Sequence, residues 1–220
     1  MRRCATTLES EMSEEELTFL VELLRNEQLT GPHLEIGTAA GGTLCQMMKC
    51  FDKDVRPSFV VVDRMSYFPD QQGAFRSNLK SHNLDPDSVD LRINTSQAAF
   101  VESSRSTEKF DFILIDASHK ILAVMADLRW ARQLNVGGIV CLHDYADKFP
   151  GVVLAVDRFL ASHPEYEKIG SSGSLLAIRK TRPGRHREVT PFDRLYSYAL
   201  FVPLLVQRKL AKRQNRQKAA

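Results

Sequence analysis

Between residues 33 and 163 of this 220-residue chain, short apolar runs alternate with segments that have helical spacing of apolar residues. The predicted strands are 33–37, 58–63, 89–93, 111–116 and 138–143, and the predicted helices are 43–51, 70–82, 97–104, 119–135 and 152–163. Apolar runs without polar alternation, such as 59–62 and 112–115, are typical of strands that are buried on both faces. The alternation therefore predicts an α/β fold in which helices cover a parallel sheet.

The segments at either end of this alternation complete the predicted organisation. Ser13 and Glu16 form a capping-box pattern, which predicts a helix at the start of the domain. Two short extended runs, 166–170 and 174–179, predict an antiparallel hairpin at the edge of the sheet. We expect one domain over 1–180, a linker over 181–191 that contains two prolines and a glycine, and a tail over 192–220 that is apolar and then basic.

The charge distribution and the cysteines exclude some classes of protein. Residues 179–220 hold 12 basic and 2 acidic residues, whereas the rest holds 18 basic and 25 acidic ones. An acidic body disfavours nucleic-acid binding, except through the tail. Without any C-x-x-C spacing, free thiols in a reducing compartment are expected at Cys4, Cys45, Cys50 and Cys141. No secretory signal or long apolar run is evident, so we expect a cytoplasmic protein with the tail as its candidate membrane contact.

A glycine-containing turn follows the first predicted strand, where the sequence from Glu35 to Thr43 reads EIGTAAGGT. Gly37 and Gly41 allow a tight turn and a close approach of the backbone to a ligand. Asp63 ends the second predicted strand, 26 residues after Gly37. A carboxylate at this position suits the two hydroxyls of a ribose. Tight packing and loop capping are the alternative explanations, but together these features favour a cofactor that contains a nucleoside.

Two residues of this turn distinguish between cofactors. A dinucleotide site requires G-x-G-x-x-G, but Ala39 occupies the middle glycine position, where its Cβ would hinder approach of a pyrophosphate. Glu35 places a carboxylate two residues before the first glycine, and this suits a cationic ligand better than a diphosphate. S-adenosylmethionine has an amino group and a sulfonium but no phosphate. The charges therefore favour S-adenosylmethionine over NAD.

Two further stretches make the pattern more specific. Residues 115–119 read IDASH, and residues 137–145 read GGIVCLHDY, so that a D-x-x-H motif is followed by G-G-x-x-x-x-H-D. With the glycine turn, these motifs resemble class I S-adenosylmethionine-dependent methyltransferases over roughly residues 13–180. The resemblance is strongest to the branch of cephalosporin-hydroxylase-like proteins and macrolide-sugar O-methyltransferases.

The resemblance implies a doubly wound, Rossmann-like sheet of seven strands, mostly parallel, whose C-terminal hairpin is antiparallel. It also implies that Ser96, which follows the third strand, lies near the adenine. The candidate cofactor-binding residues are Glu35, Gly37, Thr38, Gly41, Thr43, Asp63, Ser96 and Asp116.

A candidate metal site follows from the ends of the fourth and fifth predicted strands, which are neighbours in a parallel sheet. Asp116, His143 and Asp144 could converge there, and oxygen ligands suit Mg²⁺. Several relatives in the branch bind a divalent metal with this set, and some have an acidic residue where this chain has His143. An imidazole ligand would tolerate Mn²⁺ better than Mg²⁺. Alternatively, these residues only cap loops and bind water.

The transfer of a methyl group to a hydroxyl requires that the hydroxyl lose its proton. His119 and His143 are the candidate bases, with Asp116 as the third candidate catalytic residue. Alternatively, His119 caps the helix that is predicted to begin there. We therefore expect an O-methyltransferase, metal-assisted, that acts on a small molecule or a sugar; the sugar rests on the resemblance alone.

Two other functions fit parts of the sequence. An NAD(P)-dependent oxidoreductase of the same sheet class is disfavoured by Ala39, by Glu35, and by the three-residue spacing of Tyr145 and Lys148, where Tyr-x-x-x-Lys is needed. A non-catalytic binding or membrane-tethering protein would depend on residues 192–220 instead. That segment could lie on a membrane surface, contact a second subunit in a homo-oligomer, or pack on the body of the same chain.

Overall fold

The computed structural model describes residues 10–184 and 189–218, and in this part of the chain seven strands form one sheet. The strands are β1 (His33–Ile36), β2 (Phe59–Asp63), β3 (Val89–Ile93), β4 (Phe110–Ile115), β5 (Leu134–Leu142), β6 (Tyr166–Ser172) and β7 (Leu175–Lys180). Their order across the sheet is β3-β2-β1-β4-β5-β7-β6. Strands β1 to β5 are parallel, while β7 is antiparallel to both β5 and β6. This is the predicted doubly wound, mostly parallel sheet with an antiparallel hairpin.

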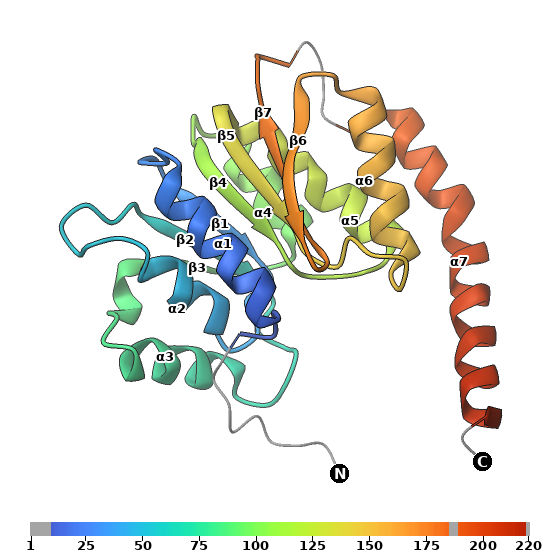
Figure 1. Cartoon of the computed structure of the whole chain (residues 1–220), viewed down its shortest axis with the longest axis horizontal. Coiled ribbons are helices and arrows are strands. Elements are labelled where there is room, and N and C mark those ends of the chain that lie inside the picture. Colours follow the sequence, from blue (N-terminus) through green and yellow to red (C-terminus); the bar gives the residue numbers. More distant parts are fainter. Residues whose placement is uncertain (1–9, 185–188, 219–220) are drawn as a thin grey trace.

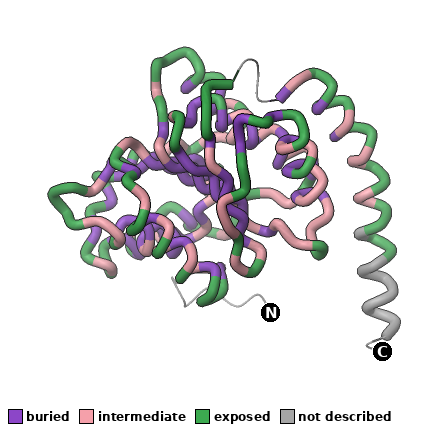
Figure 2. The backbone as a smooth tube through the Cα atoms, turned by 45° about the horizontal axis from the view of Figure 1, so that its top comes forward, coloured by how far each residue is buried: buried purple, intermediate pink, exposed green. Residues whose placement is uncertain are grey.

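The helices cover both faces of the sheet (Figure 1). They are α1 (Glu14–Asn26), α2 (Gly42–Met48), α3 (Gln71–Ser81), α4 (Ser96–Ser103), α5 (Ile121–Asp127), α6 (Pro150–Ser162) and α7 (Pro191–Lys218), with short 3₁₀ helices η1 (Pro86–Ser88) and η2 (Leu128–Gln133). In β2, Val60 and Val62 pack with α4, α5 and α6, whereas Phe59 and Val61 pack with α1, α2 and α3. The apolar runs 59–62 and 112–115 in the centre of the sheet are accordingly buried (Figure 2), as predicted.

The largest difference from the prediction lies between α5 and β5. A helix over 119–135 was predicted, but α5 ends at Asp127, η2 follows, and β5 begins at Leu134. Leu134 pairs with Phe110, and Ile139 pairs with Phe112. Between these two pairs the pairing is irregular, because β5 has more residues than β4. Gly137 lies in this stretch with φ of +88°, a conformation that glycine adopts readily. Apolar spacing does not separate a 3₁₀ helix from an α-helix over so short a segment.

The strand order places a crevice at one edge of the sheet. The chain runs outward from β1 to β2 and β3, and then returns to place β4 on the other side of β1. Ligands of open α/β sheets bind at such a reversal, beyond the carboxyl ends of the strands. The turns after β1, β2, β4 and β5 all lie at that edge, and they contain most of the predicted site residues.

Helix α7 lies against α5 and α6 through its first half and extends beyond the rest of the molecule through its second half (Figure 1). Tyr196, Leu200 and Leu204 pack on the core, and Asp193 accepts a hydrogen bond from Arg158 at 2.8 Å. Among the described residues, no helix is long and apolar enough to cross a membrane. Cys45, Cys50 and Cys141 are free thiols, and Cys4 lies outside the described residues.

Candidate functional site

The turn between β1 and α2 requires glycine at two positions. Gly37 has φ of +84°, and a Cβ there would lie 2.2 Å from the carbonyl oxygen of Asp116. Gly41 has φ of +80°, and a Cβ there would lie 2.9 Å from the ring of Phe75. Any side chain at either position would therefore clash with its neighbour in a strained backbone. Because Gly37 packs directly on Asp116, the turn after β1 touches the turn after β4.

Asp63, at the end of β2, accepts hydrogen bonds from three donors. Its Oδ2 accepts from the backbone N–H of Thr38 at 2.9 Å, and its Oδ1 accepts from the N–H of Met65 at 2.6 Å and from Gln71 Nε2 at 3.2 Å. Gln71 also donates to the carbonyl of Ala39 at 2.9 Å. Asp63 and Gln71 together fix the shape of the glycine turn. No pattern in the sequence indicated Gln71, because a glutamine at the start of a helix is not distinctive.

Glu35 is completely buried in β1 beneath the glycine turn. Burial raises the pKa of its carboxyl to about 8, and the nearby carboxylates of Asp63 and Asp116 add to the rise, against a hydrogen bond from Thr38. No group among the described residues is hydrogen-bonded to its Oε2 atom. A buried carboxyl that lacks a cationic partner favours a cationic ligand beside it.

Three further candidate residues follow the ends of β1 and β3. Thr38 is buried, and Thr43, at the start of α2, shares a 2.6 Å hydrogen bond with the hydroxyl of Ser10. Ser96, the first residue of α4, accepts a hydrogen bond from the indole N–H of Trp130 at 3.0 Å. Trp130 is fully buried.

At the ends of β4 and β5, an imidazole and two carboxylates converge. The Nδ1 atom of His143 lies 3.1 Å from Asp116 Oδ1 and 3.6 Å from Asp144 Oδ2. One ligand atom from each of the three side chains lies within 4.8 Å of the others. The convergence that the strand order predicted is therefore present.

The charges in this cluster compensate one another. Burial by itself would lower the pKa of His143, but its hydrogen bonds to Asp116 and Asp144 outweigh this and raise the pKa to about 11. Burial opposes ionisation of Asp144, but hydrogen bonds from His119 and His143 outweigh it and lower its pKa. Asp144 has φ of +61°, a conformation that is unusual for a residue other than glycine. This backbone conformation holds its carboxylate between the two histidines.

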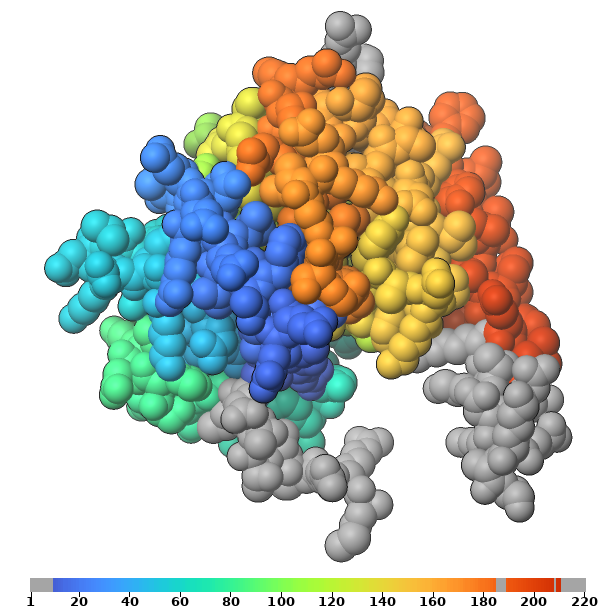
Figure 3. All heavy atoms as spheres, in the orientation of Figure 1, coloured from blue at the N-terminus to red at the C-terminus, as the bar shows by residue number. Residues whose placement is uncertain are grey.

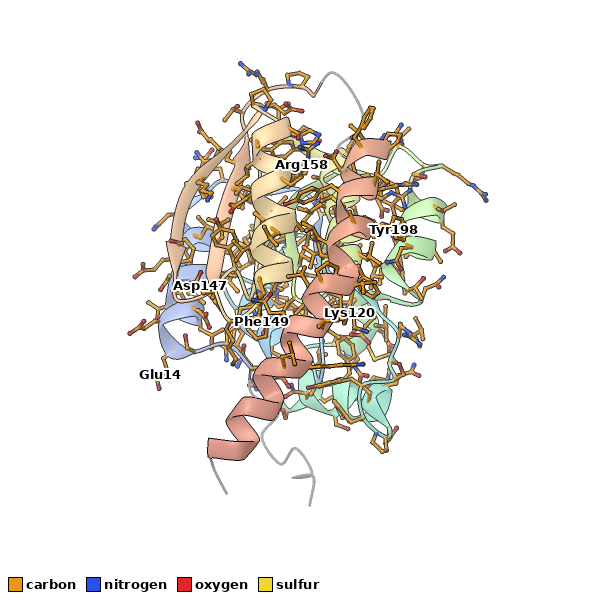
Figure 4. All side chains as sticks on the ribbon, turned by 90° about the vertical axis from the view of Figure 1, so that its right-hand side faces the viewer. Glu14, Lys120, Asp147, Phe149, Arg158 and Tyr198 are labelled. Atoms are coloured by element: carbon orange, nitrogen blue, oxygen red, sulfur yellow. The ribbon has the colours of Figure 1, made fainter. Side chains whose placement is uncertain are left out.

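His119 is the more exposed histidine of the cluster, with 35% of its side chain accessible to solvent. Its Nε2 atom lies 2.5 Å from Asp144 Oδ2, and its ring packs on Phe149 with a centroid distance of 4.4 Å. The alternative that His119 caps a helix is wrong, because α5 begins after Lys120, and Lys120 is the N-cap residue. Figure 4 shows Lys120 and Phe149, which directly precede α5 and α6, at the same end of these two helices.

Glu16 joins this cluster from the other end of the chain. Its Oε2 atom accepts from the N–H of Ser13 at 2.8 Å, which completes the capping box of α1, and lies 3.4 Å from His143 Nε2. Its Oε1 atom accepts from the N–H and the hydroxyl of Ser174, both at 2.7 Å. Burial would raise the pKa of Glu16, but the hydrogen bonds from Ser174 and Ser13 outweigh this and lower it to about 2. Figure 3 shows the resulting contact of α1 with the β6–β7 hairpin.

The sequence identified Glu16 as a capping residue only. A capping box explains a glutamate at this position completely, so no signal in the sequence indicated its second role beside His143. The contact depends on the hairpin turn, where a Cβ on Gly173 would lie 2.7 Å from the Glu16 carboxylate.

The two halves of this site can do different chemistry. Around Glu35 and Asp63, the protein offers a tight turn with acidic groups that have no basic partner within the described part of the chain, and this suits a cationic nucleoside. Around His119 and Asp144, it offers an imidazole oriented by a carboxylate, which can accept a proton. Asp116 belongs to both halves, since its backbone contacts Gly37 and its side chain contacts His143.

Known proteins share both the sequence pattern and the fold. A family described as a methyltransferase domain matches residues 34–145, about half of the chain. No curated protein matches the sequence. Among solved structures, an O-methyltransferase from Bacillus cereus in complex with S-adenosylhomocysteine is 20% identical, with a TM-score of 0.61 over 77% of this chain and 83% of that one.

Two other similar structures come from biosynthetic enzymes. The O-methyltransferase TomG of tomaymycin synthesis, from Streptomyces achromogenes, is 18% identical, with a TM-score of 0.62 over 78% of this chain and 82% of that one. A TDP-rhamnose 3′-O-methyltransferase of calicheamicin biosynthesis is 15% identical, with a TM-score of 0.56 over 74% and 76%. The family match and the shared fold lead to one conclusion: this chain belongs to the methyltransferase-domain family and has the fold of the class I S-adenosylmethionine-dependent methyltransferases.

Proposed function

We propose that this enzyme transfers the methyl group of S-adenosylmethionine to a hydroxyl of a small molecule or a sugar. One observation carries the proposal. The pair of His119 and Asp144, with a 2.5 Å contact, lies beside a glycine turn that packs directly on Asp116. A group that can accept a proton and a turn that suits a nucleoside therefore adjoin one another at the same edge of the sheet.

The proposed cofactor site uses residues from four strand ends, and its charge supports the cofactor. Glu35 beneath the turn would be ionised beside a cation, and its negative charge would then favour the amino and sulfonium groups of S-adenosylmethionine and oppose the diphosphate of NAD(P). The similar structures from Bacillus cereus and Streptomyces achromogenes hold S-adenosylhomocysteine and S-adenosylmethionine, respectively. The residues that we propose to line this site are Glu35, Gly37, Thr38, Gly41, Thr43, Asp63, Ser96 and Asp116.

His119 is the proposed general base. When its Nε2–H donates to Asp144, its Nδ1 atom carries the free lone pair and can take the proton of an acceptor hydroxyl. Asp144 then stabilises the imidazolium that forms. His143 is already held as a cation between two carboxylates, with its pKa raised to about 11, and is a positioning residue in this state.

A divalent metal fits the same residues. Two carboxylates and one imidazole form a donor set that suits Mn²⁺ or Mg²⁺, and the candidate ligand atoms lie within 4.8 Å of one another. Asp116, His143 and Asp144 would hold the ion, and His143 would bind it as the neutral imidazole. A bound ion would lower the pKa of a hydroxyl that approaches it.

The comparisons suggest a chemical class for the methyl acceptor. One similar structure is named for a TDP-rhamnose hydroxyl, and sugar hydroxyls are therefore the first acceptors to test, together with phenols. Residues 192–220 remain a predicted contact segment, for a membrane surface or for a second subunit.

The decisive experiment combines binding with turnover. We would titrate the purified protein with S-adenosylhomocysteine by calorimetry, without metal and with Mg²⁺ or Mn²⁺, and then measure transfer of labelled methyl groups to a panel of sugars and phenols. We expect micromolar binding in all arms, and transfer to at least one hydroxyl. Tighter binding or faster transfer with metal that is lost in Asp144→Asn would support the metal site.

NADH serves as the competing ligand in the same experiment. Binding of NADH, seen as a change of nicotinamide fluorescence, without binding of S-adenosylhomocysteine would overturn the cofactor proposal. Methyl transfer to amines alone would overturn the hydroxyl as acceptor while leaving the cofactor in place.

A further inference from the structure

A groove between α5 and α7 has a composition that differs from the rest of the molecule. It has a cavity volume of about 440 Å³, which is within the range of ligand pockets. Among the described residues that line it, three are basic, namely Lys120, Arg129 and Arg194, and none is acidic. Its other walls are mostly apolar, and they include Tyr198 and Phe201 of α7. Such a groove is complementary to a ligand with an anionic group and an apolar part.

Two of these basic side chains are available to an anion. Among the described residues, neither Lys120 nor Arg194 forms an ion pair, whereas Arg158 on the neighbouring α6 is paired with Asp193. Arg129 lies over the ring of Phe100, 4.3 Å from its centroid. The groove therefore concentrates positive charge on a body in which residues 1–178 have seven more acidic than basic residues.

Beside the groove, α7 carries an apolar stripe that faces solvent. Its six large side chains are each at least 50% exposed: Phe192, Leu195, Tyr198, Val202, Val206 and Leu210. They recur every three or four residues, so they share roughly a third of the circumference of the helix. Tyr196, Leu200 and Leu204 pack on the core instead. The exposed stripe is therefore not part of the core. Tyr198, which is labelled on α7 in Figure 4, belongs to the stripe and also lines the groove.

The sequence of α7 becomes strongly basic after the stripe. Between residues 208 and 218 there are six Lys or Arg and no Asp or Glu. Asp193, the one acidic residue of α7, is engaged by Arg158 and Thr190. An apolar stripe together with a cluster of basic residues is typical of helices that lie in the interface of an anionic membrane.

We propose that α7, together with the α5–α7 groove, binds the surface of a membrane that contains anionic phospholipids. The stripe buries its apolar side chains among the headgroups and the first acyl carbons, while Arg194, Lys120 and the basic end of α7 contact lipid phosphates. A second copy of the chain fits this surface less well. It would bring two basic helices together without a free acidic residue on α7 to pair with them.

The orientation of α7 gives this surface a relation to the candidate site. In Figures 1 and 4, the second half of α7 extends beyond the body at the end where α1 begins. Glu16 of α1 contacts His143 at that end. A membrane bound along α7 therefore lies beside the edge of the sheet that holds the site.

The test is co-flotation of the full chain with two kinds of vesicle, one of phosphatidylcholine alone and one of phosphatidylcholine mixed with anionic phosphatidylglycerol. We expect binding to the anionic vesicles, weakened at high salt because the contacts are electrostatic. The double variant Val202→Glu/Val206→Glu and the single variant Arg194→Glu should each weaken binding at least tenfold. Matched controls are Val55→Glu/Val136→Glu and Arg105→Glu, which change exposed residues outside α7 and should bind normally.

Calorimetry with S-adenosylhomocysteine verifies that each variant is folded, since none of these residues belongs to the proposed cofactor site. Three results would overturn the proposal. The first is equal binding, or none, to neutral and anionic vesicles. The second is complete competition by millimolar inorganic phosphate, which would indicate a site for a free anion. The third is a dimer in solution that Val202→Glu/Val206→Glu dissociates, without vesicle binding by the native chain.

Discussion

The two acidic halves of the candidate site differ in how their charges are compensated. Glu35 is fully buried and has no cationic partner among the described residues, and burial raises its pKa to about 8. Asp144 is also buried, but it contacts His119 and His143, and its pKa is lowered. The two carboxyls lie at the same edge of the sheet, at the ends of β1 and β5. Burial therefore dominates at Glu35, whereas at Asp144 the hydrogen bonds from two histidines outweigh the effect of burial.

This difference shows which half of the site favours an external cation. The Asp144 half already contains its positive charge and can orient a base in the free enzyme. The Glu35 half gains most from a ligand that brings a positive charge, as S-adenosylmethionine does. If the Glu35 half and the Asp144 half responded alike to ligand and pH, this difference in charge compensation would be refuted.

The largest effect is expected from His119→Gln. Glutamine can still donate to Asp144 but cannot accept the proton, so we expect methyl transfer to fall by about 10²- to 10⁴-fold. Binding of S-adenosylhomocysteine should not change, because the Glu35 half is intact. The measurement is kcat/KM for the hydroxyl acceptor found in the panel. The control is His82→Gln, which changes a histidine outside the cluster that is hydrogen-bonded to Lys49. An equal loss of methyl transfer in both variants would contradict the role of His119.

The next effect is expected from Asp63→Ala. The variant removes the acceptor of the Thr38 and Met65 N–H groups as well as the proposed ribose ligand. We expect S-adenosylhomocysteine to bind about 100-fold more weakly, because hydrogen bonds to a charged group contribute about 1.5–3 kcal/mol. Calorimetry measures the affinity for S-adenosylhomocysteine, and Asp87→Ala is the control for the loss of an exposed carboxylate. An affinity within threefold of the native value would remove Asp63 from the site.

Glu35→Gln tests the uncompensated carboxyl directly. At pH 7 the free enzyme holds a proton on Glu35, because its pKa is about 8, and a cationic ligand beside it should expel up to one proton. We expect this release to disappear in the variant, and S-adenosylmethionine to bind about tenfold more weakly. Calorimetry in buffers of different ionisation enthalpy measures the number of protons released on binding. Equal release by both proteins would assign the proton to another group.

The same variant makes a prediction for stability. The pKa of Glu35 in the folded state, about 8, is above the value of 4.5 that is usual for a glutamate, so the folded state binds an extra proton between these two pH values. The contribution of Glu35 to the free energy of unfolding is therefore full below pH 4.5 and is lost as the pH rises towards 8. Denaturant titrations across this window should show a steeper loss of stability for the native chain than for Glu35→Gln. Parallel curves would mean that Glu35 is ionised in the free enzyme.

The smallest effect is expected from Ser13→Ala. This variant removes the capping hydroxyl of α1, which should lower the free energy of unfolding by about 1 kcal/mol. Glu16 keeps its bonds to Ser174, so binding of S-adenosylhomocysteine should remain. Urea unfolding measures the loss, and Ser104→Ala, on an exposed hydroxyl at the end of α4, is the control. A large loss of methyl transfer in Ser13→Ala would mean that the capping box also positions His143.

The elements that were predicted best are those with a local cause. Continuous apolar runs identified the central strands, because a strand buried on both faces has no polar alternation. The positive φ of Gly37 and Gly41 follows from a strand and a helix joined by a tight turn. The convergence of Asp116, His143 and Asp144 was predicted because the ends of parallel neighbours share one edge.

The residues that were missed depend on contacts across long sequence separations. Glu16 and Ser174 are 158 positions apart, and the glutamate already has a complete local explanation as a cap. Gln71 reaches Asp63 from the following helix, which no local pattern indicates. The irregular pairing of β5 with β4 moved the start of the strand to Leu134, because a register shift is decided by the partner strand.

The sequence by itself determined the order of the elements, the glycine turn and the residue types at each strand end, since these depend on local sterics and on apolar patterning. Only the tertiary structure decided the ionisation of these residues. Glu35 and Asp144 are both acidic residues at one edge of a sheet, yet the pKa of one carboxyl is raised and that of the other is lowered. The physical reason is that a pKa depends on burial and on the charges within a few ångströms, and the fold alone brings those together.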